Sequence, residues 1–135
     1  MNLRRALVLA FALLCLWGCG PKMLKTKGRV LKDGAPFVAG TGEFVRVTFV
    51  PIFEGGKLAD DFYVAQVNSK DGTFVAAGKD LRGMPPGKYR VAIELDKRRS
   101  DQLHGQFSAE ASPFVFDVDG NTQEIVIDLA KPPAK

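Results

Sequence analysis

Hydrophobic and polar residues alternate along most of the chain in short runs, which is the pattern of half-buried β-strands. Turn-forming Gly, Pro, Asp and Asn residues separate the runs, and no helical period follows the first 20 residues. The sequence therefore predicts an all-β domain. The seven expected strands are residues 25–31, 43–50, 62–68, 73–76, 88–95, 114–118 and 122–129.

The alternation also predicts which side chains face the core. In residues 88–95 every second side chain is large and apolar, while the residues between them are smaller or charged. Strands of this kind can form two sheets about 10 Å apart, so we expect a β-sandwich. The predicted inward residues are Val45, Val47, Phe49, Tyr63, Ala65, Val67, Tyr89, Val91, Ile93, Leu95, Phe114, Phe116, Val118, Ile125, Ile127 and Leu129.

The first residues have a different pattern. Arg4 and Arg5 precede an unbroken apolar run over residues 6–17. This run is too short to span a membrane, which takes about 20 apolar residues, but it fits the apolar part of an export signal, about 7–15 residues. It ends in Leu16-Trp17-Gly18-Cys19, which resembles the lipobox of bacterial lipoproteins. The resemblance implies cleavage after Gly18, attachment of diacylglyceryl to the Cys19 thiol, and acylation of the new amino group.

These observations divide the chain of 135 residues into four expected segments. They are a lipoprotein signal peptide (residues 1–18), the lipidated Cys19 with a tether (residues 19–27), one β-domain (residues 28–129) and a tail (residues 130–135). Cys15 would be removed and Cys19 acylated, so the hydrophobic core must hold the domain without disulfides. We expect a monomer, exported and anchored at the outer membrane or the periplasmic face of the cell envelope.

The order of the turns carries a second resemblance. Asp33-Gly34-Ala35-Pro36, Asp71-Gly72-Thr73-Phe74 and Pro86-Gly87-Lys88-Tyr89 occur in succession. Together they are similar to transthyretin-like, carboxypeptidase-regulatory-like domains, which implies a seven-strand, prealbumin-like (Ig-like) sandwich. We expect positive φ angles at the glycines of these turns, because tight turns often require them. The motif is therefore a signature of fold and carries no chemistry.

Few residues suggest catalysis. The single histidine, His104, lies near Ser100 and Asp101 in a long polar stretch over residues 96–111. A catalytic triad needs each side chain to be oriented by a rigid scaffold, and its members usually come from separate elements. We therefore interpret this stretch as a solvated loop and expect no catalytic residues and no enzyme.

Metal and cofactor sites are not expected either. With one histidine and no available cysteine, the chain offers few ligands for zinc or copper. Asp117, Asp119 and Asn121 resemble part of a calcium loop, as do Asn68 and Asp71, but neither group has the full ligand spacing or the closing glutamate. We interpret both as turns.

Charge and aromatic content narrow the choice of partners. The net charge of +4 falls to +2 when Arg4 and Arg5 are removed, which is too weak a signal for nucleic acid. The only basic run is Lys97-Arg98-Arg99, which is either a solvated hairpin end or a contact for anionic lipid or acidic polymer. Three phenylalanines lie beside loops and could be exposed, although burial in the core is the simpler interpretation. They are Phe53, Phe62 and Phe107.

We therefore expect a lipid-anchored cell-envelope protein with a non-catalytic interaction or scaffold module. Its partners would be the membrane, through the anchor, and another envelope protein or a cell-wall polymer. The alternative is a polysaccharide-binding or small-ligand-binding protein of the envelope. Exposed aromatic side chains in a loop cluster would favour this alternative.

Overall fold

The computed structural model describes residues 20–122 and 124–133, so the expected signal peptide and Cys19 lie outside the described residues. Within this part of the chain the structure is all-β, as predicted. No helix among the described residues has the length and apolarity needed to cross a membrane. The elements are β1 (Thr26–Lys32), β2 (Ala35–Pro36), β3 (Glu43–Pro51), the 3₁₀ turn η2 (Glu54–Gly56), β4 (Tyr63–Val67), β5 (Thr73–Ala76), β6 (Gly87–Lys97), β7 (Ser100–Asp101), β8 (Val115–Val118) and β9 (Glu124–Asp128).

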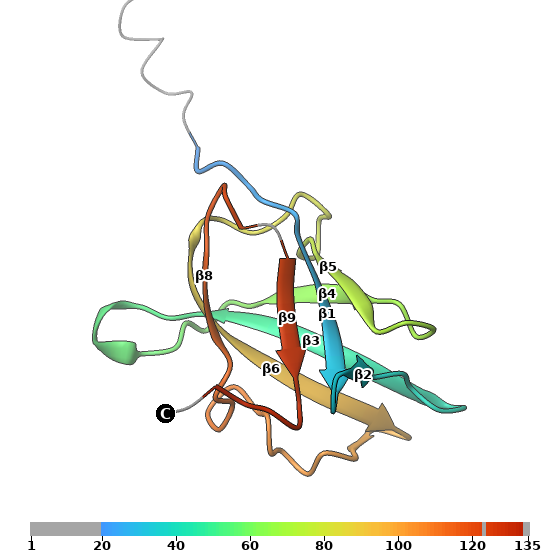
Figure 1. Ribbon diagram of the computed structural model, residues 1–135. Coiled ribbons are helices and arrows are strands. Elements are labelled where there is room, and N and C mark those ends of the chain that lie inside the picture. Colours follow the sequence, from blue (N-terminus) through green and yellow to red (C-terminus); the bar gives the residue numbers. More distant parts are fainter. Residues whose placement is uncertain (1–19, 123, 134–135) are drawn as a thin grey trace, which may run out of the picture.

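The strands form one sheet that curls into a half-barrel (Figure 1). Their order is β2-β1-β5-β4-β3-β6-β7, with β8 also beside β6 and β9 also beside β1. The pairs are antiparallel except β1 with β9, which are parallel. We expected seven strands in two sheets, whereas the described residues form nine hydrogen-bonded strands in one sheet. The two additional strands, β2 and β7, have two residues each, which is too short for an alternating pattern.

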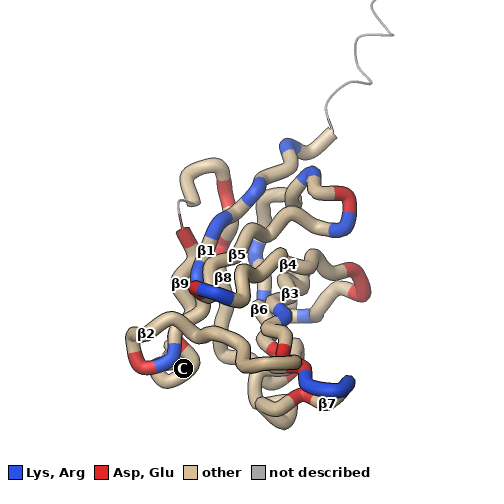
Figure 2. Tube along the Cα trace, turned by 90° about the vertical axis from the view of Figure 1, so that its right-hand side faces the viewer, with Lys and Arg blue, Asp and Glu red and all other residues tan. Residues whose placement is uncertain are grey.

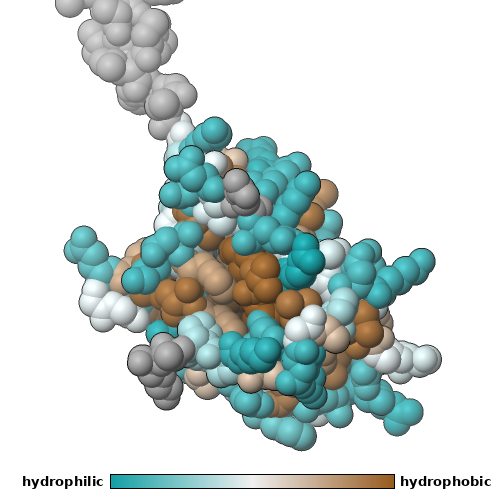
Figure 3. All heavy atoms as spheres, in the orientation of Figure 1, coloured by the Kyte–Doolittle hydropathy of each residue, from teal (hydrophilic) through white to brown (hydrophobic). Residues whose placement is uncertain are grey.

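Curling the sheet brings its distant strands onto one core. Residues of β1 and β9 pack in the same buried cluster as residues of β3 and β6. In Figure 3 a hydrophobic area occupies the middle of the visible face, between β8 and β9. Each of these two strands pairs with one neighbour only, β8 with β6 and β9 with β1, and their core residues Val118, Ile125 and Ile127 are nonetheless buried.

The predicted inward faces are confirmed with one difference. Val47, Phe49, Tyr89 and Ile93 are almost fully buried, and the rings of Phe49 and Tyr89 meet edge to face with centroids 6.1 Å apart. Leu95 is only half-buried and lies outside the core cluster. It is paired with Val45, another half-buried residue, in the part of β6 that continues beyond the core to Lys97.

The stretch over residues 96–111 contributes more to the core than its polarity predicted. Phe107 is buried, and its ring lies 5.6 Å from that of Phe114. After this stretch, the buried Ser112 hydroxyl donates a hydrogen bond to the carbonyl oxygen of Val91 at 2.5 Å. The segment therefore closes one end of the half-barrel, beside β6.

Two of the three predicted turn glycines have positive φ. Gly34 has φ +78° and Gly72 has φ +70°, and a Cβ atom on Gly72 would lie 2.8 Å from the carbonyl oxygen of Val30. The prediction for Gly87 is wrong. It does not have a positive φ, because it already belongs to β6 and pairs with Val118 in extended conformation.

The chain joins the fold at Leu24. Leu24 and Met84 exchange two backbone hydrogen bonds of 2.8 and 2.9 Å. A Cβ atom on Gly83 would lie 2.3 Å from the carbonyl oxygen of Leu24, so only glycine permits this contact without a shift. β1 then begins at Thr26, two residues before the expected start of the domain.

Candidate functional site

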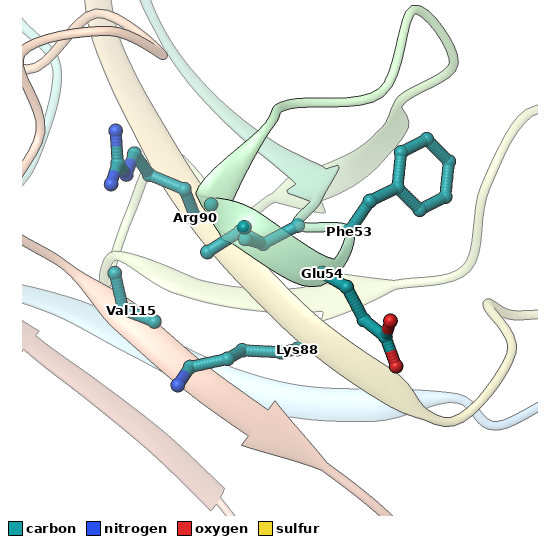
Figure 4. Close-up of a pocket in the computed structure, with 8 residues that line it drawn as sticks. Phe53, Glu54, Lys88, Arg90 and Val115 are labelled. Atoms are coloured by element: carbon teal, nitrogen blue, oxygen red, sulfur yellow. The ribbon is translucent and has the colours of Figure 1, made fainter.

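An open groove with a volume of about 540 Å³ lies on the outer face of β6 (Figure 4). One side is formed by the loop that includes η2, and the other by Val115 of β8. Lys88 and Arg90 project from β6 between these walls. Because they are two residues apart on one strand, they share the face that points away from the core.

The η2 loop is positioned by hydrogen bonds at the end of β3. Ile52 pairs with Leu58, and the Phe53 N–H donates to the carbonyl oxygen of Lys57 at 2.8 Å. Gly55 and Gly56 both have φ +80°, which allows the chain to reverse within this short segment. The loop leaves the side chain of Phe53 59% exposed at the rim of the groove.

Arg90 uses little of its hydrogen-bonding capacity. Its Nη1 donates to the carbonyl oxygen of Glu110 at a long 3.5 Å, and its Nε is buried without a partner among the described residues. A guanidinium group has five N–H donors, so most of those on Arg90 remain for another acceptor.

The groove is cationic on balance. Neither Lys88 nor Arg90 forms an ion pair within residues 20–122 and 124–133. The one acidic residue of the lining is Glu54, whose carboxylate points away from both cationic groups in Figure 4. The site can therefore bind an anionic group through charge-assisted hydrogen bonds. The exposed Phe53 ring lies at the rim, on the side of Glu54 and away from the two cationic groups (Figure 4). The lining contains no Ser, Thr, Cys or His.

The structure places Ser100, Asp101 and His104 together at β7 and the turn after it. The carboxylate of Asp101 accepts the backbone N–H groups of Gly105, Leu103 and Leu95 at 2.8–3.0 Å. Burial raises the pKa of Asp101, but these three bonds and the nearby His104 outweigh it and lower the pKa below its ordinary value. Asp101 thus organises the turn, while the side chains of Ser100 and His104 are exposed.

The two fragments that resemble calcium loops also organise turns. Oδ1 of Asp119 accepts the N–H of Asn121 at 2.8 Å, and Oδ1 of Asp71 accepts the hydroxyl of Thr73 at 2.7 Å. The bonds from the Thr73 side chain and N–H lower the pKa of Asp71. Across the described residues, no three His, Cys, Asp or Glu side chains are grouped in a way that could hold a metal ion.

The basic run forms the tight turn between β6 and β7. Arg98 and Arg99 have φ angles of 52° and 65°, and Lys97 pairs with Glu43 at 3.0 Å. Figure 2 shows this turn at the end of the molecule opposite to the point where the chain enters at Gly20. It is therefore remote from the expected anchor.

Sequence reasoning singled out Phe53 as a residue that could be exposed, but it did not identify the groove. Arg90 was expected only as an outward position of the strand over residues 88–95, and Lys88 only as part of the Pro86-Gly87-Lys88-Tyr89 motif. The signal that could have found the site is two basic residues at alternate positions of one strand, together with a Gly55-Gly56 loop that projects an aromatic side chain. Comparisons of the chain with models of known protein families, with curated proteins and with solved structures found no match.

Proposed function

We propose that this chain is a lipid-anchored protein of the bacterial cell envelope whose β-domain is a non-catalytic binding module. The Leu16–Cys19 pattern supports export and acylation. The pairing of Leu24 with Met84 supports a close connection between anchor and domain, because this first backbone pairing comes only five positions after Cys19. The lipid would hold the module at a membrane, and its surface would make the contact.

We also propose that the domain is a distant transthyretin-like sandwich. Two features support this assignment: the succession of the three sequence motifs, of which the Gly34 and Gly72 motifs form the expected turns, and the packing of β1 and β9 against β3 and β6 around one core. In a curled sheet the two halves can act as the layers of a sandwich while remaining connected by hydrogen bonds.

The observation that carries the binding function is the groove with Lys88 and Arg90 beside Phe53. Two cationic side chains without ion-pair partners on one strand face suit a carboxylate or phosphate group. We propose that an acidic segment of another envelope protein binds there. The mechanism is tethering, since the anchor raises the local concentration of the module near partners in the same envelope.

The second candidate is a binding protein for an acidic polysaccharide or small ligand. The exposed Phe53 at the rim favours it, because an aromatic face offers a large apolar contact at a low cost in side-chain entropy. The same two cationic groups would then bind acidic substituents of the sugar chain.

Two measurements test the proposal. Metabolic palmitate labelling should mark the wild-type protein and not Cys19→Ser, and equal labelling of both would disprove the anchor. For the groove, a photo-crosslinking residue at position 53 should give envelope adducts that disappear in the Lys88→Glu/Arg90→Glu variant. The matched control is Lys70→Glu, an exposed change in the β4–β5 turn, which should leave the adducts unchanged. Mass spectrometry of the adducts distinguishes protein from glycan.

A further inference from the structure

The end of the domain where the chain enters carries three exposed apolar side chains. Met23 is 36%, Phe62 is 45% and Leu81 is 50% exposed. Met23, Phe62 and Lys79 line one shallow depression, and the ammonium group of Lys79 lies 5.1 Å from the centre of the Phe62 ring. We call Met23, Phe62, Lys79, Leu81 and Arg82 the anchor-proximal surface.

The loop that carries Leu81 is fixed relative to the incoming chain. Met84 pairs with Leu24, and the N–H of Gly83 donates to the carbonyl oxygen of Ala77 at 2.8 Å. Figure 1 shows the first described residues and the loop between β5 and β6 at the same end of the molecule. Leu81 has φ +60°, a conformation that an L-residue adopts only where its surroundings impose it. Leu81 is therefore displayed at a defined place beside the chain.

The distance to the anchor is short. Leu24 is five positions after Cys19 in the sequence. A fully extended chain spans at most about 3.6 Å per residue, so Leu24 can lie no more than about 18 Å from the acylated residue. With the acyl chains in a bilayer, this end of the domain is held close to the membrane surface, whereas the Arg98–Arg99 turn lies at the opposite end of the domain (Figure 2).

We propose that the anchor-proximal surface docks on the membrane that holds the anchor, with Met23 and Leu81 inserted into the interfacial layer. This inference rests on the proposed lipid anchor. Exposed apolar side chains of this kind are stabilised when they enter the boundary between headgroups and acyl chains. The anchor keeps the protein at the membrane, and the surface fixes its orientation, which places the groove with Lys88 and Arg90 to one side of the domain.

Charge has a minor part in this contact. Arg82 already pairs with Asp80 at 3.3 Å, and Asp61 borders the same depression as Lys79. Lys79 and Arg82 thus have acidic neighbours, so the apolar side chains dominate at the depression itself. Lys22 and Lys25, exposed on the entering chain beside Met23, form no ion pair among the described residues and add positive charge at this end. The apolar contact should therefore persist at high salt and without anionic lipid, unlike the binding of a polybasic segment.

The test uses the processed, acylated protein in vesicles of phosphatidylcholine with or without phosphatidylglycerol. Because the only cysteines are Cys15 and Cys19, a cysteine placed in the domain is the one free thiol after acylation. Leu81→Cys, Lys79→Cys and Arg98→Cys are labelled with an environment-sensitive fluorophore. Nitroxide lipids should quench labels 81 and 79 several-fold more than label 98, in both kinds of vesicle and at low and high salt.

The outcomes separate this inference from the proposed function. If the protein floats with vesicles but labels 81, 79 and 98 are quenched equally, the anchor stands and the orientation is disproved. If Cys19 is not acylated and the protein does not float, both proposals fail. If label 81 is quenched in pure lipid but is shielded and crosslinked to a protein in native envelope membranes, this surface binds a protein and the membrane contact is disproved.

Discussion

The carboxylate of Asp128, at the end of β9, accepts the backbone N–H of Gly34 at 3.0 Å, across 94 positions of sequence. Its other oxygen accepts the N–H groups of Asp33 and Ala130 at 3.1 and 3.0 Å. The last strand is thereby joined to the first turn of the domain, at the end of the parallel pair of β1 and β9. One side chain thus connects the beginning and the end of the fold.

This relationship predicts a loss of stability in acid. Desolvation raises the pKa of Asp128, but the N–H groups of Ala130, Gly34 and Asp33 and the charge of Lys131 outweigh it and lower the pKa. A lowered pKa in the folded state adds stability above the unfolded value, about 3.9, and this contribution is lost as the pH falls through the folded value. Asp128→Asn should reduce stability at neutral pH and narrow its difference from wild type at low pH. Urea unfolding from neutral to low pH measures this stability difference, with Asp60→Asn as an exposed control. A difference between Asp128→Asn and wild type that does not change with pH contradicts the prediction.

The same substitution should destabilise the protein at Gly72 and have little effect at Gly87. At Gly72 a Cβ atom would meet the carbonyl oxygens of Val30 and Phe37 at 2.8 and 2.9 Å, in a backbone with φ +70°. Gly72→Ala should therefore cost more than about 1 kcal/mol of stability. Gly87→Ala should change stability by no more than about 0.5 kcal/mol, because its Cβ would meet only the Tyr89 ring at 3.7 Å. Equal losses in urea unfolding would show that this assignment of the turns is wrong.

Tyr89 combines packing with a buried hydroxyl that donates to the carbonyl oxygen of Pro85 at 2.5 Å. By analogy with Phe→Ala, Tyr89→Ala should cost about 3–5 kcal/mol, whereas Tyr89→Phe should lose only the hydrogen bond, about 1 kcal/mol. Burial, with a smaller effect of Tyr63, raises the pKa of Tyr89 to about 12. A raised pKa adds stability below the unfolded value near 10, and this contribution is lost as the pH rises from there towards 12. Ultraviolet titration of the wild type should show a tyrosine that ionises near pH 12, and this ionisation should be missing from Tyr89→Phe. A wild type without this late ionisation would refute the prediction.

Asp101 should matter far more than its neighbours Ser100 and His104. Its carboxylate accepts three backbone N–H groups, and two of them, those of Leu95 and Leu103, belong to half-buried residues. Asp101→Ala should cost about 1–3 kcal/mol, the range for buried donors left unsatisfied. Ser100→Ala and His104→Ala should stay within about 0.5 kcal/mol. If His104→Ala in urea unfolding is as damaging as Asp101→Ala, His104 has a role that its exposed position does not indicate.

The sequence predicted the seven longer strands because each buries one face, which leaves a period-2 pattern that is visible without a structure. It could not predict how those strands connect, since alternation is the same in a sandwich and in a curled single sheet. The parallel pairing of β1 with β9 and the bond of Asp128 with Gly34 join residues more than 90 positions apart, which no local pattern encodes. Phe107 was ambiguous for a similar reason: a lone aromatic in a polar stretch has no neighbours that show its direction. The groove was missed because Lys88 and Arg90 look like ordinary solvated positions until the loop with Phe53 is placed beside them.

Arg90 offers a test of whether the groove is functional, because its side chain forms few hydrogen bonds with the rest of the domain and therefore adds little to stability. Its Nε is buried without a partner among the described residues, and an unsatisfied buried donor costs about 1–3 kcal/mol. Arg90→Met keeps much of the apolar stem and removes this donor, so it should leave stability unchanged or raise it. Arg46→Met is the matched control on the neighbouring strand, since Arg46 pairs with Glu94 and Asp96 at 3.1 and 3.2 Å; its loss should cost up to about 1 kcal/mol.

The same two variants, compared for envelope crosslinking from position 53, should show lost adducts for Arg90→Met and retained adducts for Arg46→Met. A residue that binding requires and stability does not is the signature of a functional site. If Arg90→Met instead unfolds more easily than Arg46→Met and keeps its adducts, Arg90 is a structural residue and the groove does not carry the binding function.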